Sequence, residues 1–135
     1  PIASLIRIAA REQPTRLKSA HAADVVAAGF EREKIIVDPG LGFGKSLTDN
    51  LALMNNIAMF HALGQPLLIG ASRKRMIGAL SKEAPVDKRL GGSIAFAHHA
   101  IQQGAQIVRV HDVPETVQAL QVWRGMRDAG LTALG

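Results

Sequence analysis

The sequence has no cysteine and no tyrosine, and aromatic residues make up only 4% of its 135 positions. The absence of cysteine excludes disulfides, thiolate metal sites and thiol nucleophiles from this chain, and it is compatible with a reducing compartment. With so few aromatic rings there is little surface on which nucleic-acid bases could stack. Neither a disulfide-stapled fold nor a base-stacking nucleic-acid module is therefore expected.

Long apolar runs are also missing. No run approaches the ~20 residues that cross a bilayer, so we expect no membrane span and a cytoplasmic location. The chain begins with Pro1 and shows no signal-peptide pattern, so we expect a fragment or a processed product. Hydrophobic residues nevertheless make up 47% of the sequence, which argues against disorder and is enough for one domain with its own core.

Positive charge is in excess, with a formal net charge of +5. One group of basic residues lies in an N-terminal stretch that looks helical; its members are Arg7, Arg11, Arg16 and Lys18. A second group, at residues 73–75, follows an apolar run. This grouping and the scarcity of aromatic residues favour anionic small molecules over nucleic acid as partners.

Three short apolar runs are typical of buried parallel strands; they are KIIVD at 34–38, PLLIG at 66–70 and QIVRV at 106–110. Helical patterns precede, separate and follow them; these cover about 17–28, 47–64 with Asp49 as N-cap and Gly64 as the stop, 87–103, and 114–130. The alternation predicts an α/β fold with about three βα units. Steps of about 32 and 40 residues between strands fit part of a (β/α)8 barrel, although a doubly wound sheet would show the same alternation.

The stretch VDPGLGFGKS, at residues 37–46, ends like a phosphate-binding Walker loop. A Walker loop needs glycine at position 39, where this chain has Pro39, which fixes φ and has no N–H. The dinucleotide pattern G-x-G-x-x-G also fails, because Lys45 stands where the third glycine should be. The stretch is therefore neither common nucleotide-binding loop.

Polar residues gather where the predicted strands end. Asp38 ends the first strand, the second runs into Ser72, Arg73 and Lys74, and the third carries Arg109, followed by His111 and Asp112. In parallel α/β architectures the carboxyl ends of the strands open on one face, where sites form. We therefore expect these side chains to meet at one rim.

Four of these residues also have a structural interpretation that stays open. Asp38 before Pro39 could simply form a turn, and Lys74 could be a solvated lysine at a helix start. Arg109 could form an ion pair with Asp38 or with Asp112. His111 could be a hydrogen-bonded core histidine.

Other residues are interpreted as packing residues. His98 and His99 point about 100° apart on a helix, so we do not interpret them as metal ligands. Met54, Met59 and Met76 are expected to fill the core. No metal-ligand set is predicted in this chain.

Three segments and the spacing between them carry a family resemblance: IIVDPGLGFGKSLTDNLALM, PLLIGASRKRMIG and RLGGSIAFAHHAIQQGAQIVRVHDV. From about Gly29 to about Trp123 they resemble dihydropteroate synthase, a transferase of folate biosynthesis and a sulfonamide target. The resemblance implies a (β/α)8 TIM barrel, with the three strands as its sixth, seventh and eighth. Residues 1–135 would then be a partial pterin-binding barrel domain. That family joins p-aminobenzoate to 6-hydroxymethyl-7,8-dihydropterin pyrophosphate and releases pyrophosphate.

The resemblance also implies roles for the residues at the rim. Asp38 would bind the pterin, since a carboxylate accepts parallel bonds from an amino group and a ring N–H. Lys74 would bond the pterin carbonyl and ring nitrogen, and Phe43 would border the aminobenzoate. The remaining residues are Ser72 and Arg73, which would lie toward the aminobenzoate, and Arg109 and His111, which would hold the departing pyrophosphate. Lys74 and Arg109 are the expected catalytic residues.

The chain also departs from that family. The family's Met-His ending of strand five is absent, and residues 1–20 match no pattern. The family's Mg²⁺ ligand, an N-terminal Asn, lies outside this chain, and the full-length enzyme is expected to be a homodimer. We therefore expect a C-terminal segment that is inactive alone. Two alternatives remain, a non-catalytic scaffold or association module that at most binds pterin or phosphate, and a different phosphate-handling barrel half with converged loops.

Overall fold

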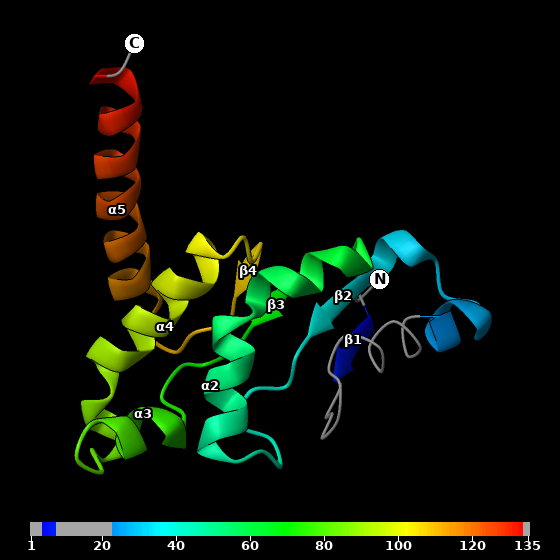
Figure 1. The fold of residues 1–135 in the computed structure, drawn as a ribbon, viewed down its shortest axis with the longest axis horizontal. Coiled ribbons are helices and arrows are strands. Elements are labelled where there is room, and N and C mark those ends of the chain that lie inside the picture. Colours follow the sequence, from blue (N-terminus) through cyan, green and yellow to red (C-terminus); the bar gives the residue numbers. More distant parts are fainter. Residues whose placement is uncertain (1–3, 8–22, 134–135) are drawn as a thin grey trace.

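The computed structural model describes the fold of residues 4–7 and 23–133 (Figure 1). The helix predicted over about 17–28 is helical at residues 23–27 and forms a turn at residue 28, and residues 17–22 lie outside the described residues. Arg7 was expected in a helix, but it ends strand β1, Ser4–Arg7. That prediction was wrong because four apolar and basic residues are too few to distinguish a strand from a helical turn by spacing.

All described strand pairings are parallel. Strand β1 pairs with β2, Ile35–Asp38, in a register that places Ser4 beside Ile35. An isolated parallel bridge from Val37 to Leu67 leads to β3, Leu68–Ile69, which pairs with β4, Ile107–Val108. The spatial order of the described strands therefore follows the sequence, which confirms the α/β class and adds a strand to the three predicted.

Two of the strands differ from prediction. Strands β3 and β4 are two residues long each, shorter than the five-residue runs that predicted them. Strand β4 is also not covered on both faces, since Ile107 is 36% exposed. No described strand pairs with its outer edge, so solvent reaches this end of the sheet.

The helical segments follow the predicted pattern with different boundaries. They are η1 Arg32–Lys34, α2 Leu47–Asn55, η2 Ile57–Leu63, α3 Arg75–Leu80, η3 Val86–Lys88, α4 Leu90–Gln102 and α5 Val113–Ala133. The single helix predicted over 47–64 divides into α2 and the 3-10 helix η2, and Gly64 ends it in the left-handed conformation with φ 69°. Ser46 is the N-cap of α2; Asp49, predicted in that role, completes a capping box from the third helical position.

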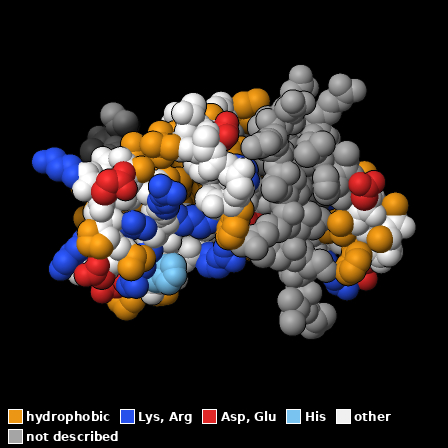
Figure 2. Space-filling view, turned by 90° about the horizontal axis from the view of Figure 1, so that it is seen from below, with side chains coloured by type: hydrophobic (Ala, Val, Ile, Leu, Met, Phe, Trp, Pro, Cys, Tyr) orange, Lys and Arg blue, Asp and Glu red, His pale blue; other side chains and the backbone are white. Residues whose placement is uncertain are grey.

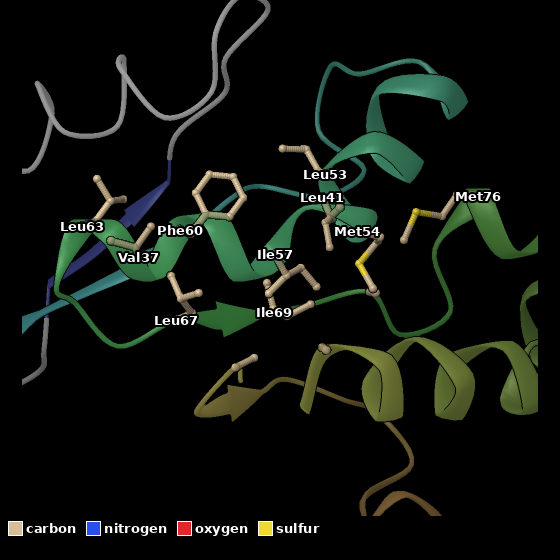
Figure 3. Packing of buried hydrophobic residues seen from close by; sticks show 13 residues of the cluster. Val37, Leu41, Leu53, Met54, Ile57, Phe60, Leu63, Leu67, Ile69 and Met76 are labelled. Atoms are coloured by element: carbon tan, nitrogen blue, oxygen red, sulfur yellow. The ribbon is translucent and has the colours of Figure 1, made fainter. Parts of the chain in front are cut away.

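The core lies between the sheet and the segments α2 and η2 (Figure 3). Its fully buried side chains include Val37, Leu41, Met54, Ile57, Phe60, Leu67 and Ile69. Met54 and Met76 are buried as predicted, whereas Met59 is 55% exposed, so its assignment to the core was wrong. Helix α5 extends away from this core (Figure 1). No described helix is both long enough and apolar enough to span a bilayer.

Candidate functional site

The carboxyl end of β2 buries a charged group. Asp38 is 2% exposed, and its Oδ1 accepts a hydrogen bond from the Gly40 N–H at 2.8 Å. This is the local turn that the structural interpretation of Asp38 described. Its Oδ2 lies 3.8 Å from Nη2 of Arg109, which follows β4. Asp38 therefore both shapes its turn and faces a cation from another strand.

The loop after Asp38 is held by its own residues. Gly40, Gly42 and Gly44 all have positive φ, at 70°, 78° and 60°. The Lys45 ammonium donates to Gly40 O at 2.7 Å and to Phe43 O at 3.2 Å. A phosphate-binding lysine would reach outward to its ligand, whereas this one closes the glycine loop.

Burial and charge act in opposite directions on Lys45. Its pKa is lowered, mainly because burial disfavours the ammonium, while the carboxylates of Asp38 and Asp49 raise it. Asn50 adds a second link, since its Oδ1 accepts from the Gly42 N–H at 2.7 Å and its Nδ2 donates to Ser46 O at 2.8 Å. The start of α2 thus fixes the loop that precedes it.

Lys74 reaches from the β3–α3 connection to this loop. Its ammonium donates to Leu41 O and lies 4.4 Å from the centre of the Phe43 ring. The side chain is partly buried, so it is not the solvated lysine of the structural interpretation. The Lys74 ammonium and the Phe43 ring are therefore in cation–π contact at the carboxyl edge of the sheet.

Ser72 contacts the residue that follows the neighbouring strand. Its Oγ lies 2.9 Å from His111 Nδ1 and accepts from the His111 backbone N–H at 3.2 Å. His111 is exposed, which excludes the core interpretation. Among the residues that the structure describes, none forms a hydrogen bond with its other ring nitrogen, Nε2.

Arg73 forms a forked ion pair with Asp112. Its Nε donates to Oδ2 at 3.1 Å and its Nη2 to Oδ1 at 2.5 Å. This hydrogen bonding lowers the pKa of Asp112 and raises that of Arg73. Arg109 forms its ion pair with Asp38, one of the two partners foreseen, and its side chain is 50% exposed.

The structure thus brings the predicted residues to one edge of the sheet, in two neighbouring groups. A pocket of about 600 Å³ is lined by Phe43 and Lys74 together with Gly42, Lys45, Ser46, Leu47, Asn50, Arg75, Met76 and Ala79. Ser72, Arg73, Arg109 and His111 are not among its lining residues. Figure 2, seen from the lower side of Figure 1, shows several Lys and Arg side chains gathered near a histidine.

Sequence reasoning missed four polar residues of this pocket, Lys45, Ser46, Asn50 and Arg75. Arg75 had a signal, since it belongs to the basic cluster at 73–75. Within the described part of the chain, the Arg75 side chain makes no hydrogen bond or ion pair. Asn50 had no signal, because its role depends on where the helix start lies relative to Gly42.

No group of three His, Cys, Asp or Glu able to hold a metal ion occurs among residues 23–132. Asp38 already accepts from Gly40 and faces Arg109, so it offers no ready cation site. His99 Nε2 is 2.9 Å from Met54 O, and the His98 ring packs edge-on to Trp123 at 5.1 Å. Both histidines are packing residues in the structure, as predicted.

Comparison with known proteins adds the family. The family described as pterin binding enzyme matches residues 9–111. Dihydropteroate synthase of Escherichia coli strain K12 is 53% identical over 95 residues, covering 70% of this chain and 33% of that protein. The enzyme of Neisseria meningitidis serogroup B is 48% identical over 114 residues, covering 82% and 40%. The chain therefore spans about a third to two fifths of these relatives.

Solved structures agree with the sequence matches. Dihydropteroate synthase of Yersinia pestis, in complex with a sulfonamide drug, superimposes with a TM-score of 0.81 at 38% identity, covering 93% of this chain and 50% of that one. The enzyme of Xanthomonas albilineans, in complex with 7,8-dihydropteroate, gives 0.83 at 36% identity, covering 91% and 49%. The family match extends over most of the described sheet and its polar edge, so the chain belongs to the pterin-binding enzyme family.

Proposed function

We propose that this chain is the C-terminal part of a dihydropteroate synthase, which joins p-aminobenzoate to 6-hydroxymethyl-7,8-dihydropterin pyrophosphate in folate biosynthesis. One observation carries the proposal: the ends of β2, β3 and β4 place Asp38, Lys74, Arg109 and His111 along one edge. Its relatives at about half identity are dihydropteroate synthases.

The pterin would bind at the buried Asp38 carboxylate and at Lys74. A pterin presents an amino group and a ring N–H side by side, and a carboxylate accepts both in parallel. Each carboxylate oxygen has two acceptor positions, so Oδ1 keeps one after bonding the Gly40 N–H. Lys74 is near enough to the same loop, at Leu41, to donate to the pterin's carbonyl and ring nitrogen.

The aminobenzoate would occupy the pocket beside Phe43. Its ring would pack near Phe43, and its carboxylate would lie among the cations Lys45, Lys74 and Arg75 that line the pocket. Arg75 suits this best, because its guanidinium makes no other polar contact among the described residues. Contact of Ser72 and Arg73 with the aminobenzoate stays a prediction, since both lie on the His111 and Asp112 side.

The leaving group would be held by Arg109 and His111. The amine nitrogen of aminobenzoate attacks the pterin's methylene carbon, the bond from carbon to pyrophosphate oxygen breaks, and the electron pair leaves with the pyrophosphate. The amine then loses a proton. Negative charge grows on the departing oxygen, and preplaced donors stabilise it. Arg109 is half exposed, so its guanidinium can meet the anion while Asp38 keeps it near.

Mg²⁺, when bound, would neutralise part of the pyrophosphate's charge. The described residues do not form a ligand set for it, as shown above, so its ligands are proposed to lie in the rest of the enzyme. The steps assigned here to Asp38, Lys74 and Arg109 do not depend on it.

We propose further that the sheet is part of a (β/α)8 barrel, with β2, β3 and β4 as its sixth, seventh and eighth strands. Successive parallel strands lie side by side in chain order, as barrel strands do, whereas a doubly wound sheet reverses its order at one point. The outer edges of β1 and β4 would pair with the remaining strands. Alone, this chain would not turn over substrate.

A homodimer of the full-length enzyme is proposed at helices α4 and α5. Together they border a groove of about 720 Å³, whose apolar lining includes Leu90, Ile94, Val122, Trp123 and Met126. Val122 is 59% and Met126 is 65% exposed. Exposed apolar side chains that gather in one patch are typical of a surface that associates with another protein. The same surface supports the second candidate function, an association module without catalysis.

A chimera tests the proposal. In it, this chain's segment from Gly29 to Trp123 replaces the matching segment of the Escherichia coli relative. We expect the chimera to form dihydropteroate and the isolated chain to form none. A folded chimera that neither binds pterin nor forms product would overturn the enzymatic proposal and favour the association module. The presence of the barrel's first strands upstream in the gene would support the enzyme.

A further inference from the structure

Arg73 has an unusual backbone conformation. Its φ is 55°, in the left-handed region that a residue with a Cβ adopts reluctantly. The residue sits between two candidate site residues, Ser72 and Lys74. Its backbone conformation therefore decides the directions in which those two side chains leave the chain.

Two residues of another helix hold this conformation. The Arg73 N–H donates to Ser93 Oγ at 2.8 Å, and Arg73 O accepts from Arg89 Nη1 at 3.0 Å. Ser93, in the first turn of α4, is 2% exposed, and its hydroxyl donates to Arg89 O at 2.7 Å. The three residues thus form a closed set of hydrogen bonds, which we call the Arg73 brace.

The brace is fixed in turn by the segment after α3. Arg89 Nε donates to Ala84 O at 2.7 Å. A Cβ on Gly78 would lie 2.7 Å from Arg89 Nη2 and 2.9 Å from Ala84 O, so only glycine leaves room here. The Arg89 side chain is therefore held in one orientation, which directs its guanidinium from the start of α4 toward Arg73.

The two neighbours of Arg73 leave in different directions. Ser72 contacts His111 at the side of the proposed pyrophosphate site. Lys74 contacts Leu41 O and the Phe43 ring at the side of the proposed pterin and aminobenzoate sites. A change in the Arg73 backbone would turn at least one of these side chains away from its partner.

We propose, on the basis of the proposed function, that Arg89 and Ser93 are positioning residues for the transferase reaction. They touch neither the lining of the pocket nor Asp38, Arg109 or His111 through any described side-chain hydrogen bond. They act through Arg73, whose left-handed backbone sends Ser72 and Lys74 to opposite sides of the site.

The test uses the chimera with Ser93→Ala and, separately, Arg89→Gln. Loss of a buried hydrogen bond to the brace is expected to lower kcat per active site about tenfold. Gly91→Ala is the matched control in the same helical turn, because a Cβ there meets nothing within 4 Å. It should leave kcat within about twofold.

A double-mutant cycle separates positioning from mere stability. Glycine adopts positive φ at no steric cost, so Arg73→Gly removes the need for the brace. In the Arg73→Gly background, Ser93→Ala should lower kcat by no more than about twofold. Equal fold-losses in both backgrounds, or a lower melting temperature with kcat per active site unchanged, would overturn the proposal.

Backbone hydrogen exchange gives a readout that does not require activity. Ser93→Ala should speed exchange of the Arg73 amide about tenfold in the chimera, and Gly91→Ala should not. An unchanged exchange rate of the Arg73 amide in Ser93→Ala would contradict the proposed role of the Arg73 brace, even if the chimera is active. A chimera that is inactive with Ser93 intact would count against the proposed function, and the exchange result would still decide the brace.

Discussion

Two loops meet at the carboxyl edge of the sheet, and they are held in different ways. The loop after β2 uses three glycines for its positive φ angles and is closed by Lys45 and Asn50, all within twelve residues of Asp38. The loop after β3 puts Arg73 in the left-handed region and relies on residues of other segments, Ser93, Arg89 and Asp112.

The difference separates local from long-range control of a functional loop. Glycine adopts the left-handed backbone conformation with little strain, so contacts between neighbouring residues are enough to fix a glycine-rich loop. Arg73 keeps a side chain that pairs with Asp112, and its conformation then needs support from a distant helix. The first loop should therefore tolerate changes elsewhere in the fold better than the second.

The largest expected effect is on pterin binding, from Asp38→Asn in the chimera. Asparagine keeps an oxygen for the Gly40 N–H, so the local loop should hold its shape while the charge is lost. Loss of a charged hydrogen-bond partner weakens binding roughly ten- to over a hundredfold. Calorimetry with a pterin analogue measures this, with Glu33→Gln, at an exposed residue of the exchanged segment, as control. Equal affinity in Asp38→Asn and the unmodified chimera would remove Asp38 from the pterin site.

Arg109→Ala should lower kcat about tenfold and change KM little, because charge on the leaving group is greatest in the transition state. Steady-state kinetics of the chimera measures both constants. Arg109 follows β4 and lies outside the loops after β2 and β3. Arg109→Ala should therefore leave the amide hydrogen exchange of both loops unchanged. An effect confined to KM would mean that Arg109 binds only the ground state.

Lys45→Met tests the local loop. The substitution removes the hydrogen bonds to Gly40 O and Phe43 O, and should lower the free energy of unfolding of the chimera by about 1.5 kcal/mol. Lys34→Met is the control, because Lys34 forms an exposed pair with Glu31 and should change stability by less than about 0.5 kcal/mol. If the two variants are equally stable, the loop does not depend on its lysine.

Asp112→Asn tests the long-range loop through pH. The pKa of Asp112 is lowered from 3.8 by the Arg73 hydrogen bonds, so the carboxylate's contribution to stability is complete above that value. It is lost as pH falls through the lower pKa of the folded state. Urea unfolding should therefore show the unmodified chimera as slightly more stable than Asp112→Asn at pH 6, with a smaller difference near pH 3. A difference that grows with acid would contradict this.

Several elements could be predicted because their signals are local. Gly64 and Gly104 follow apolar helical patterns, and both have left-handed φ in the structure, 69° and 91°. The three predicted strands contain the observed β2, β3 and β4. The split of one predicted helix into α2 and η2 was not foreseen, since apolar spacing continues across the break at Asn56.

The sequence predicted which residues belong to the candidate site better than it predicted the contacts between them. Strand ends identified Asp38, Lys74, Arg109 and His111, because parallel strands open on one side. Arg75 and Asn50 were missed, since a residue's place in a pocket wall depends on how two loops pack together. Strand β1 was missed because its four residues pair with β2 only through the tertiary fold.

The sequence by itself determined the alternation of strands and helices, the position of polar residues at strand ends, and the glycine-rich stretch that follows Asp38. These depend on backbone preference and on contacts between near neighbours, which the order of residues already specifies. The tertiary structure alone decided that Arg109 faces Asp38, that Ser72 meets His111, and that Ser93 and Arg89 hold Arg73. Those contacts join residues 16 to 71 positions apart, so they exist only once the tertiary fold has brought the strand ends together and packed the start of α4 against the connection after β3.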